Sequence, residues 1–135
     1  MNIELSQKQF RLLLDMVYIG NWVLNSARGE DRIAAYDDLE SRLFYECVKN
    51  GMSELAEFRG GTVQASRAFV EGGIHEAIMD YEDAIFFDIL SEELSRRDMQ
   101  IEGANPDDRE ELEKRIAEYN AEFEQSGIEH VKVEG

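Results

Sequence analysis

The chain has 135 residues, of which 43% are hydrophobic and 33% charged, and its formal net charge is −16 at pH 7. The length suits one domain with its own core, and the hydrophobic share excludes a disordered polyelectrolyte. Cys47 is the only cysteine, which excludes an intramolecular disulfide. Its position four residues after Leu43 predicts a small buried side chain rather than a nucleophile.

The negative charge is concentrated in the second half of the sequence. Residues 1–70 contain 10 acidic and 8 basic residues, whereas residues 71–135 contain 20 acidic and 6 basic residues. Such a surface repels nucleic acids and anionic membranes, so we expect neither as a direct partner. The opening residues lack the pattern of a signal peptide, and the apolar residues 12–24 are too short and interrupted to span a membrane. These features predict a cytoplasmic protein.

Residues 6–28 form the first predicted helix. Ser6 and Gln9 have the spacing of a capping box, in which each side chain bonds the backbone N–H of the other residue. Gly20 lies inside the helix, where glycine lowers stability, and we expect it to let a second helix approach closely.

Two further segments precede the middle of the chain. Residues 31–50 form the second predicted helix, with an apolar face. Residues 52–73 contain two glycine pairs, which favour a connection with a single helical turn.

Residues 74–98 are predicted to form the central helix. The segment has no Gly or Pro, and its apolar residues occupy more than one side, as in a helix with several neighbours. Asn105 before Pro106 predicts the start of a final helix, and Gly127 ends it. The apolar stripe of this final helix is narrow, which places it on the outside of the fold.

These elements predict an all-α or nearly all-α fold. We expect a single helical domain over residues 1–135, with four main helices around the central one. Alternating apolar residues at 3–5 and 131–133 also allow a minor two-stranded ribbon formed by the termini.

No motif in the sequence indicates an enzymatic activity. A nucleophile elbow, a phosphate-binding loop and a dinucleotide fingerprint are all missing from the sequence, so we expect no catalytic residue and no cofactor. One catalytic alternative is a metal site, because His75 and Glu82 lie seven residues apart on one side of the central helix. Di-metal helical bundles usually carry Glu-x-x-His on two helices, and this sequence has no copy of it.

The acidic residues have two interpretations. They are solvated carboxylates that keep the protein soluble, or they form a docking face for a basic partner. Basic residues interrupt the acids of the final helix at helical spacing, which favours internal ion pairs. The residues predicted to carry a docking face are Glu111, Glu118, Glu122, Asp80 and Asp83.

Four hypotheses about function remain open. The first is a small acidic, non-enzymatic protein that binds another protein as an adaptor, regulator or inhibitor. The second is a nucleic-acid mimic whose carboxylates block a DNA- or RNA-binding protein. The third is a metal-dependent protein or enzyme centred on His75. The fourth is a homo-oligomer, formed through a second apolar stripe of the central helix with Phe86, Phe87, Leu90 and Leu94.

Part of the central helix resembles a known group of sequences. Residues 81–98 follow the pattern Y-[DE]-x-x-x-F-[FW]-x-x-L-x-x-x-L-x-x-R-D, with Phe87 where a tryptophan is expected. The opening helix around Trp22 and the segment from Glu122 to Ile128 are similar too. The chain thus resembles a group of small bacterial proteins of no known activity. The resemblance implies a mostly helical bacterial cytosolic protein and carries no catalytic residues.

Overall fold

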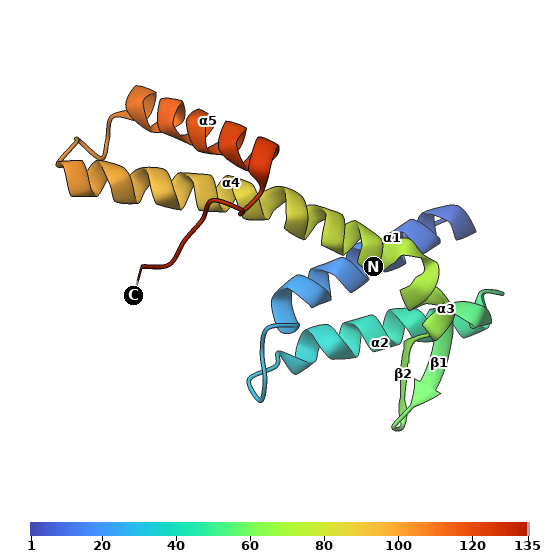
Figure 1. Cartoon of the computed structure of the whole chain (residues 1–135). Helices are drawn as coiled ribbons and strands as arrows, with labels where there is room; N and C mark the ends of the chain where they lie inside the picture. The colour runs from blue at the N-terminus through green and yellow to red at the C-terminus, as the bar shows by residue number, and fades with distance from the viewer. Residues whose placement is uncertain (135) are drawn as a thin grey trace. The chain divides into compact units, whose positions relative to one another are not determined.

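A computed structural model describes residues 1–134, and contacts divide the chain into two compact units, Met1–Ile78 and Met79–Gly135. Over the described residues the fold is mostly helical, with four main helices and a two-stranded antiparallel sheet (Figure 1). This confirms the predicted fold class, while the single domain stays a prediction. No helix in the described chain combines the length and apolar character needed to cross a bilayer.

Helices α1 (Gln7–Asn25) and α2 (Ala34–Lys49) form an antiparallel pair in the first unit (Figure 1). The predicted capping box is confirmed at the start of α1. Ser6 Oγ accepts a hydrogen bond from the Gln9 amide at 3.1 Å, and Gln9 Oε1 accepts one from the Ser6 amide at 3.0 Å. Two amide groups that a helix end would leave without a partner are thereby satisfied.

A β-hairpin follows α2, after a 3₁₀ turn at Ser53–Leu55. Strand β1 (Ala56–Arg59) pairs with β2 (Thr62–Ala65), and the two central turn residues, Gly60 and Gly61, have φ angles of 61° and 83°. Positive φ at both positions is typical of the tight turn that matches the twist of a hairpin. The prediction of a connection with one helical turn at residues 52–73 was therefore wrong in this part.

The minor two-stranded ribbon is present, but the hairpin forms it and the termini do not. Residues 3–5 and 131–133 have no strand structure. Local pairing across a two-residue turn closes a much shorter loop than pairing of the two chain ends, which makes the hairpin the less costly ribbon in entropy.

A sharp bend separates the hairpin from the longest helix. The short helix α3 (Arg67–Phe69) continues into a wider turn at Val70–Ile74, after which α4 (His75–Glu102) begins. Gly73 has a φ angle of 113° within this bend, a backbone conformation that residues other than glycine rarely adopt. Residues 70–73 were predicted as part of the connection and Ile74 as the start of the central helix, and Gly73 accounts for the break in helical direction.

The core of the first unit lies between α1, α2 and the hairpin. The Phe44 and Phe69 rings meet edge to face with centroids 4.9 Å apart, and the Arg11 guanidinium lies 4.5 Å from the centroid of the Phe69 ring. Cys47 is fully buried, as predicted, and burial raises the pKa of its thiol. The buried cluster consists of Leu14, Phe44, Cys47, Met52, Val63, Phe69 and Ile74.

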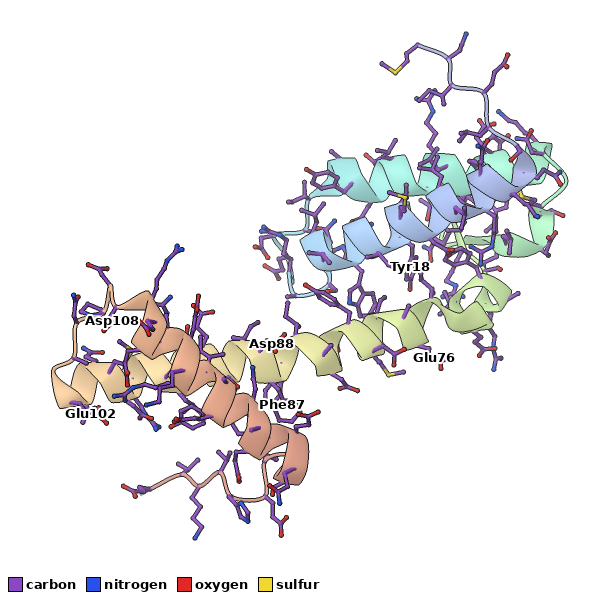
Figure 2. All side chains as sticks on the ribbon, turned by 90° about the horizontal axis from the view of Figure 1, so that it is seen from above. Tyr18, Glu76, Phe87, Asp88, Glu102 and Asp108 are labelled. Carbon is purple, nitrogen blue, oxygen red and sulfur yellow. The ribbon has the colours of Figure 1, made fainter. Side chains whose placement is uncertain are left out.

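In the second unit α4 and α5 (Arg109–Ser126) form an antiparallel helical hairpin (Figure 1). Ser91 and Ser95 of α4 are fully buried, and Ser91 Oγ donates to Asn120 Oδ1 of α5 at 2.5 Å. Phe87 lies on α4 (Figure 2), and the centroid of its ring is 5.3 Å from that of Phe123 on α5. Small polar residues and one aromatic pair thus join the two helices.

The start of α5 differs from the predicted one. Asn105 was expected to cap this helix, but its side chain accepts a hydrogen bond from the Asp107 amide at 3.0 Å and stabilises a local turn. The cap is Asp108, whose side chain accepts from the Glu111 amide at 3.2 Å. Asn and Asp side chains stabilise turns and helix N-termini equally well. The sequence alone therefore does not show which of Asn105, Asp107 and Asp108 caps the helix, and the first of them was favoured. Gly127, with a φ angle of 54°, ends the helix as predicted.

The environment of Gly20 differs from the expectation that it allows a close helix approach. A Cβ atom built there meets no heavy atom within 4 Å, whereas Gly73 needs its positive φ. We therefore expect Gly20→Ala to raise the free energy of unfolding by about 0.5–1 kcal/mol, because alanine favours a helix interior. Gly73→Ala should lower it by roughly 1–2 kcal/mol through backbone strain. Urea unfolding of both variants measures the difference.

Gly72→Ala is the control for the bend, because Gly72 has open space around it and an ordinary φ. A Gly72→Ala variant as unstable as Gly73→Ala would contradict the backbone explanation.

Candidate functional site

Two buried asparagine side chains of α1, Asn21 and Asn25, connect α1 to the start of α2 through hydrogen bonds. Asn25 is fully buried; its Nδ2 donates to Asn21 Oδ1 at 2.6 Å, and its Oδ1 accepts from the Ile33 amide at 2.7 Å. Ile33 is the N-cap of α2 and has no side-chain cap of its own. Asn25 therefore supplies, from a neighbouring helix, a contact that a capping box would supply locally.

Asn21 extends this network to the carboxylates of α2. Its Nδ2 donates to Asp37 Oδ1 at 2.9 Å and to Glu40 Oε2 at 3.3 Å. Asp37 also pairs with Arg32, whose Nη2 lies 2.8 Å from Asp37 Oδ1 and whose Nε lies 3.0 Å from Oδ2. These hydrogen bonds, first from Arg32 and then from Asn21, lower the pKa of Asp37.

Glu40 has the opposite electrostatic environment. Burial raises the pKa of its carboxyl group, and the hydrogen bond from Asn21 opposes that shift by less. Tyr18 lies nearby, and its pKa is raised by burial and by the charge of Glu40. A carboxyl group with a raised pKa inside a pocket is a candidate for ion binding or proton transfer, whereas Tyr18 remains a neutral hydroxyl.

Aromatic side chains form the other side of the site. Tyr18 Oη and His75 Nε2 share a hydrogen bond of 2.6 Å, and the His75 ring meets the Trp22 ring edge to face with centroids 4.9 Å apart. The Tyr18 and Trp22 rings are stacked, with centroids 6.4 Å apart. One turn of α1 thus presents two aromatic residues beside a histidine at the first residue of α4.

Two cavities open at this network. The smaller one has a volume of about 350 Å³ and the larger one about 610 Å³, and both are lined in part by Tyr18, Arg32 and Glu40. The larger cavity continues along α2 to the hairpin, where Arg59 and Gln64 line it. Convergent polar groups with shifted pKa values make this the candidate functional site of the first unit.

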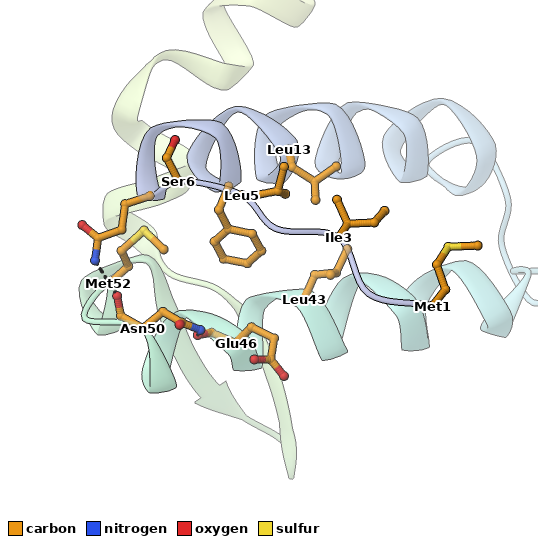
Figure 3. Close-up of a pocket in the computed structure, with 11 residues that line it drawn as sticks. Met1, Ile3, Leu5, Ser6, Leu13, Leu43, Glu46, Asn50 and Met52 are labelled. Carbon is orange, nitrogen blue, oxygen red and sulfur yellow. Dashed lines mark hydrogen bonds between the residues drawn. The ribbon is translucent and has the colours of Figure 1, made fainter.

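A third cavity in the first unit is mainly apolar. The extended residues 1–5 cross the groove between α1 and α2, where Ile3 and Leu5 lie near Leu13 and Leu43 around about 410 Å³ (Figure 3). Most of the side chains that line it are apolar, so it offers packing surface rather than chemistry.

No protein family matches this chain, and comparisons with curated proteins and with solved structures found no match. The site's chemistry therefore rests on its own geometry.

The predicted acidic residues are only partly brought together. Glu111, Glu118 and Glu122 of α5 line one surface cavity of about 460 Å³, together with Asp98 and Glu102 of α4. Glu111 pairs with Arg115 at 2.9 Å, and Glu122 pairs with His130.

The remaining predicted acids lie apart from that cavity. Asp80 and Asp83 are exposed on α4 and do not line it. Within residues 1–134, Asp80, Asp83 and Glu118 make no ion pair.

The metal hypothesis gains no further ligand from the structure. His75 is half-buried and bonded to Tyr18, whereas Glu82 is exposed on the part of α4 that belongs to the second unit. In residues 1–134 no group of three or more His, Cys, Asp or Glu side chains is arranged to hold a metal ion. His75 and Glu82 as metal ligands stay a prediction.

The apolar stripe predicted for self-association is divided between two environments. Phe87 packs against Phe123, and Leu90 and Leu94 are half-buried, whereas Phe86 remains 51% exposed. The helical hairpin of the second unit therefore uses part of this stripe internally. Self-association stays a prediction.

Sequence reasoning missed the site around Asn21, Asn25 and Glu40. One signal was available: two asparagines four residues apart lie on one face of an otherwise apolar helix. Buried amides in such positions need partners, and their partners are usually specific polar groups of a neighbouring element.

We expect Asn25→Ala to lower the free energy of unfolding by about 1–3 kcal/mol, because the Ile33 amide and the Asn21 oxygen would lose a buried partner. Urea unfolding measures this loss. Asn50→Ala is the control, since the exposed Asn50 side chain makes one hydrogen bond to the Glu46 oxygen. Equal destabilisation by the two substitutions would show that the buried network has no special role.

The raised pKa of Glu40 predicts a pH-dependent stability difference. The folded state holds this proton more tightly than the unfolded chain, so stability falls as pH rises from the ordinary value of 4.5 through the folded-state pKa. Glu40→Gln removes this loss, and its stability relative to the original chain should therefore be greater at pH 8 than at pH 5. Urea unfolding at both pH values provides the measurement.

Asp37→Asn is the control for the pH experiment. The lowered pKa of Asp37 gives stability that is fully present above the ordinary value of 3.8 and is lost as pH falls through the folded-state pKa. Ionisation of Asp37 itself therefore adds no change in stability between pH 5 and pH 8, and Asp37→Asn should be destabilising at both pH values. Its difference between the two pH values should be smaller than that of Glu40→Gln, because removing the Asp37 charge only reduces the pKa shift of Glu40. A Glu40→Gln effect that is equal at pH 5 and pH 8 would contradict the assigned shift.

Proposed function

We propose that this chain is a non-enzymatic protein that binds another protein through the side of α4 that faces away from α5. The observation that carries the proposal is a pair of large apolar side chains left exposed on that helix. Phe86 and Ile89 are 51% and 54% exposed, and acidic residues flank them in sequence. The cytoplasmic location expected from the sequence belongs to the same proposal.

Helical spacing supports the existence of one continuous face. Glu82, Phe86, Ile89 and Glu93 follow one another at intervals of four, three and four residues, so their side chains lie on one side of α4. The residues of α4 that contact α5 lie on the opposite side: Phe87, Ser91, Asp98 and Glu102 make those contacts. The helix α5 therefore leaves this face uncovered. We call Glu82, Phe86, Ile89 and Glu93 the outward face.

The chemistry of the outward face indicates the kind of partner it fits. Exposed aromatic and aliphatic side chains grouped together mark interaction surfaces, and buried aromatic anchors supply much of the energy of an interface. Glu82 and Glu93 make no ion pair within residues 1–134. A complementary partner would offer an apolar pocket with lysine or arginine side chains around it.

The acids predicted from the sequence have a supporting role in this proposal. Asp80, Asp83 and Glu118 are exposed carboxylates of the second unit and would speed the approach of a basic partner. Glu111 already forms an ion pair with Arg115, and Glu122 shares a hydrogen bond with His130, which reduces their contribution. The same internal pairing lowers the charge density of α5 that a nucleic-acid mimic would need, so mimicry stays a prediction.

The test is quantitative capture of binding proteins from a lysate of the source cell, with the tagged protein as bait. The double variant Phe86→Ser and Ile89→Ser should weaken binding of the principal captured protein by at least about tenfold, since truncating an anchor residue of an interface costs about 2 kcal/mol of binding free energy or more. Rising salt should weaken the same interaction, because the flanking carboxylates are solvent-exposed.

The control is the double variant Leu12→Ser and Met16→Ser, whose side chains are 62% and 71% exposed on α1 in the other unit. Capture should persist in this variant. Equal capture by both double variants and the original chain would contradict binding through the outward face. Light scattering of the purified protein shows whether the captured partner is a second copy.

A further inference from the structure

The smaller cavity of the first unit has the features of a binding site for a cationic group. Six residues line its volume of about 350 Å³: Tyr18, Asn21, Trp22, Ser26, Arg32 and Glu40. We call this cavity the Glu40 pocket. It lies wholly within the first unit, so its argument is independent of the outward face of α4.

The charges in the pocket do not cancel. Two nitrogen atoms of the Arg32 guanidinium group, Nε and Nη2, donate hydrogen bonds to Asp37. The third nitrogen atom, Nη1, donates to the Asn25 carbonyl oxygen at 3.4 Å. Glu40 receives only the 3.3 Å hydrogen bond from Asn21 and makes no ion pair within residues 1–134. A half-buried carboxylate with so few partners is held at an energetic cost that a cation would remove.

The position of Glu40 is fixed by buried groups rather than by chance. Asn21, which holds Glu40 and Asp37 together, is 7% exposed and is itself held by the fully buried Asn25. Because both amides have their partners inside the fold, the two carboxylates of α2 keep their places without a ligand. Such prior ordering reduces the entropy lost on binding.

Aromatic rings complete the pocket. The stacked Tyr18 and Trp22 rings are on α1, facing the same cavity as Glu40. Ring faces attract cations, and a tryptophan ring does so most strongly. The Tyr18 hydroxyl group shares a 2.6 Å hydrogen bond with His75 Nε2. The protein itself therefore orients this hydroxyl group, and a ligand is not needed to do so.

We propose that the Glu40 pocket binds a primary alkylammonium group, with Glu40 as its ion-pair partner and the Tyr18 and Trp22 rings beside its carbon chain. An anion is a poor fit, since the one guanidinium of the pocket is already paired and the carboxylate is not. The ammonium group belongs either to a free amine or to a lysine side chain of a protein. The net charge of −16 favours both.

The experiment uses Trp22, which is the only tryptophan of the chain and lines the pocket. Its fluorescence should change saturably when n-butylamine is added to the full-length protein, and n-butanol, of the same shape but uncharged, should give no saturable change. Nα-acetyl-lysine N-methylamide and 1,4-diaminobutane form two further arms, and the tighter of the two identifies a protein side chain or a free amine as the source.

Glu40→Gln should weaken n-butylamine binding by at least about tenfold, because a charge-assisted hydrogen bond is lost. Glu46→Gln is the control: it removes one negative charge from the same helix but lines neither of the two cavities at Glu40, and binding should be retained. Circular dichroism verifies that both variants are folded.

The proposal would be overturned by no saturable response to any ammonium compound, by an equal response to n-butanol, or by unchanged affinity in folded Glu40→Gln. Binding of acetate in place of n-butylamine would also overturn it.

Discussion

The hydrogen bonds between Asn25 and the backbone of Ile33 are the constraint on which the first unit depends. They fix where α2 begins relative to α1, and this places Asp37 about one turn and Glu40 about two turns further along α2. Because Asn25 is fully buried, the cost of leaving any of its bonds unmade is high, and the helix pair has one favoured register. The cavities beside Tyr18 then follow from the path of α2.

The second unit uses the same kind of joint with different residues. Ser91 and Ser95 have small side chains at the contact between α4 and α5. Asn120 Oδ1 accepts a hydrogen bond from the Ser91 hydroxyl group, and the Tyr119 hydroxyl group donates one to Asp98. Hydrogen bonds of this type add little net stability but select one arrangement of two helices among many apolar ones. Large apolar side chains are meanwhile left on the outside, Phe86 and Ile89 among them. That distribution is the opposite of what stability alone would favour.

The helices could be predicted because their signals are local. Apolar periodicity, the Ser6 capping box and Gly127 each act within a few residues, and the structure confirms them. The hairpin was missed because a pair of glycines is equally typical of an irregular loop and of the tight turn that Gly60 and Gly61 form here. The polar site was missed for a different reason: the partners of Asn21 are 16 and 19 residues away, and no short-range pattern names them.

The complete burial of Cys47 has a practical consequence for a protein with two compact units. Its thiol reaches a water-soluble alkylating reagent only when the core around Phe44 and Phe69 opens, so the modification rate measures that opening. Residues 79–135 contain no cysteine, so the reagent does not modify the second unit when it unfolds. Thiol trapping combined with urea unfolding of the whole chain therefore separates the two units' stabilities, and shows whether they unfold as one cooperative body or in succession.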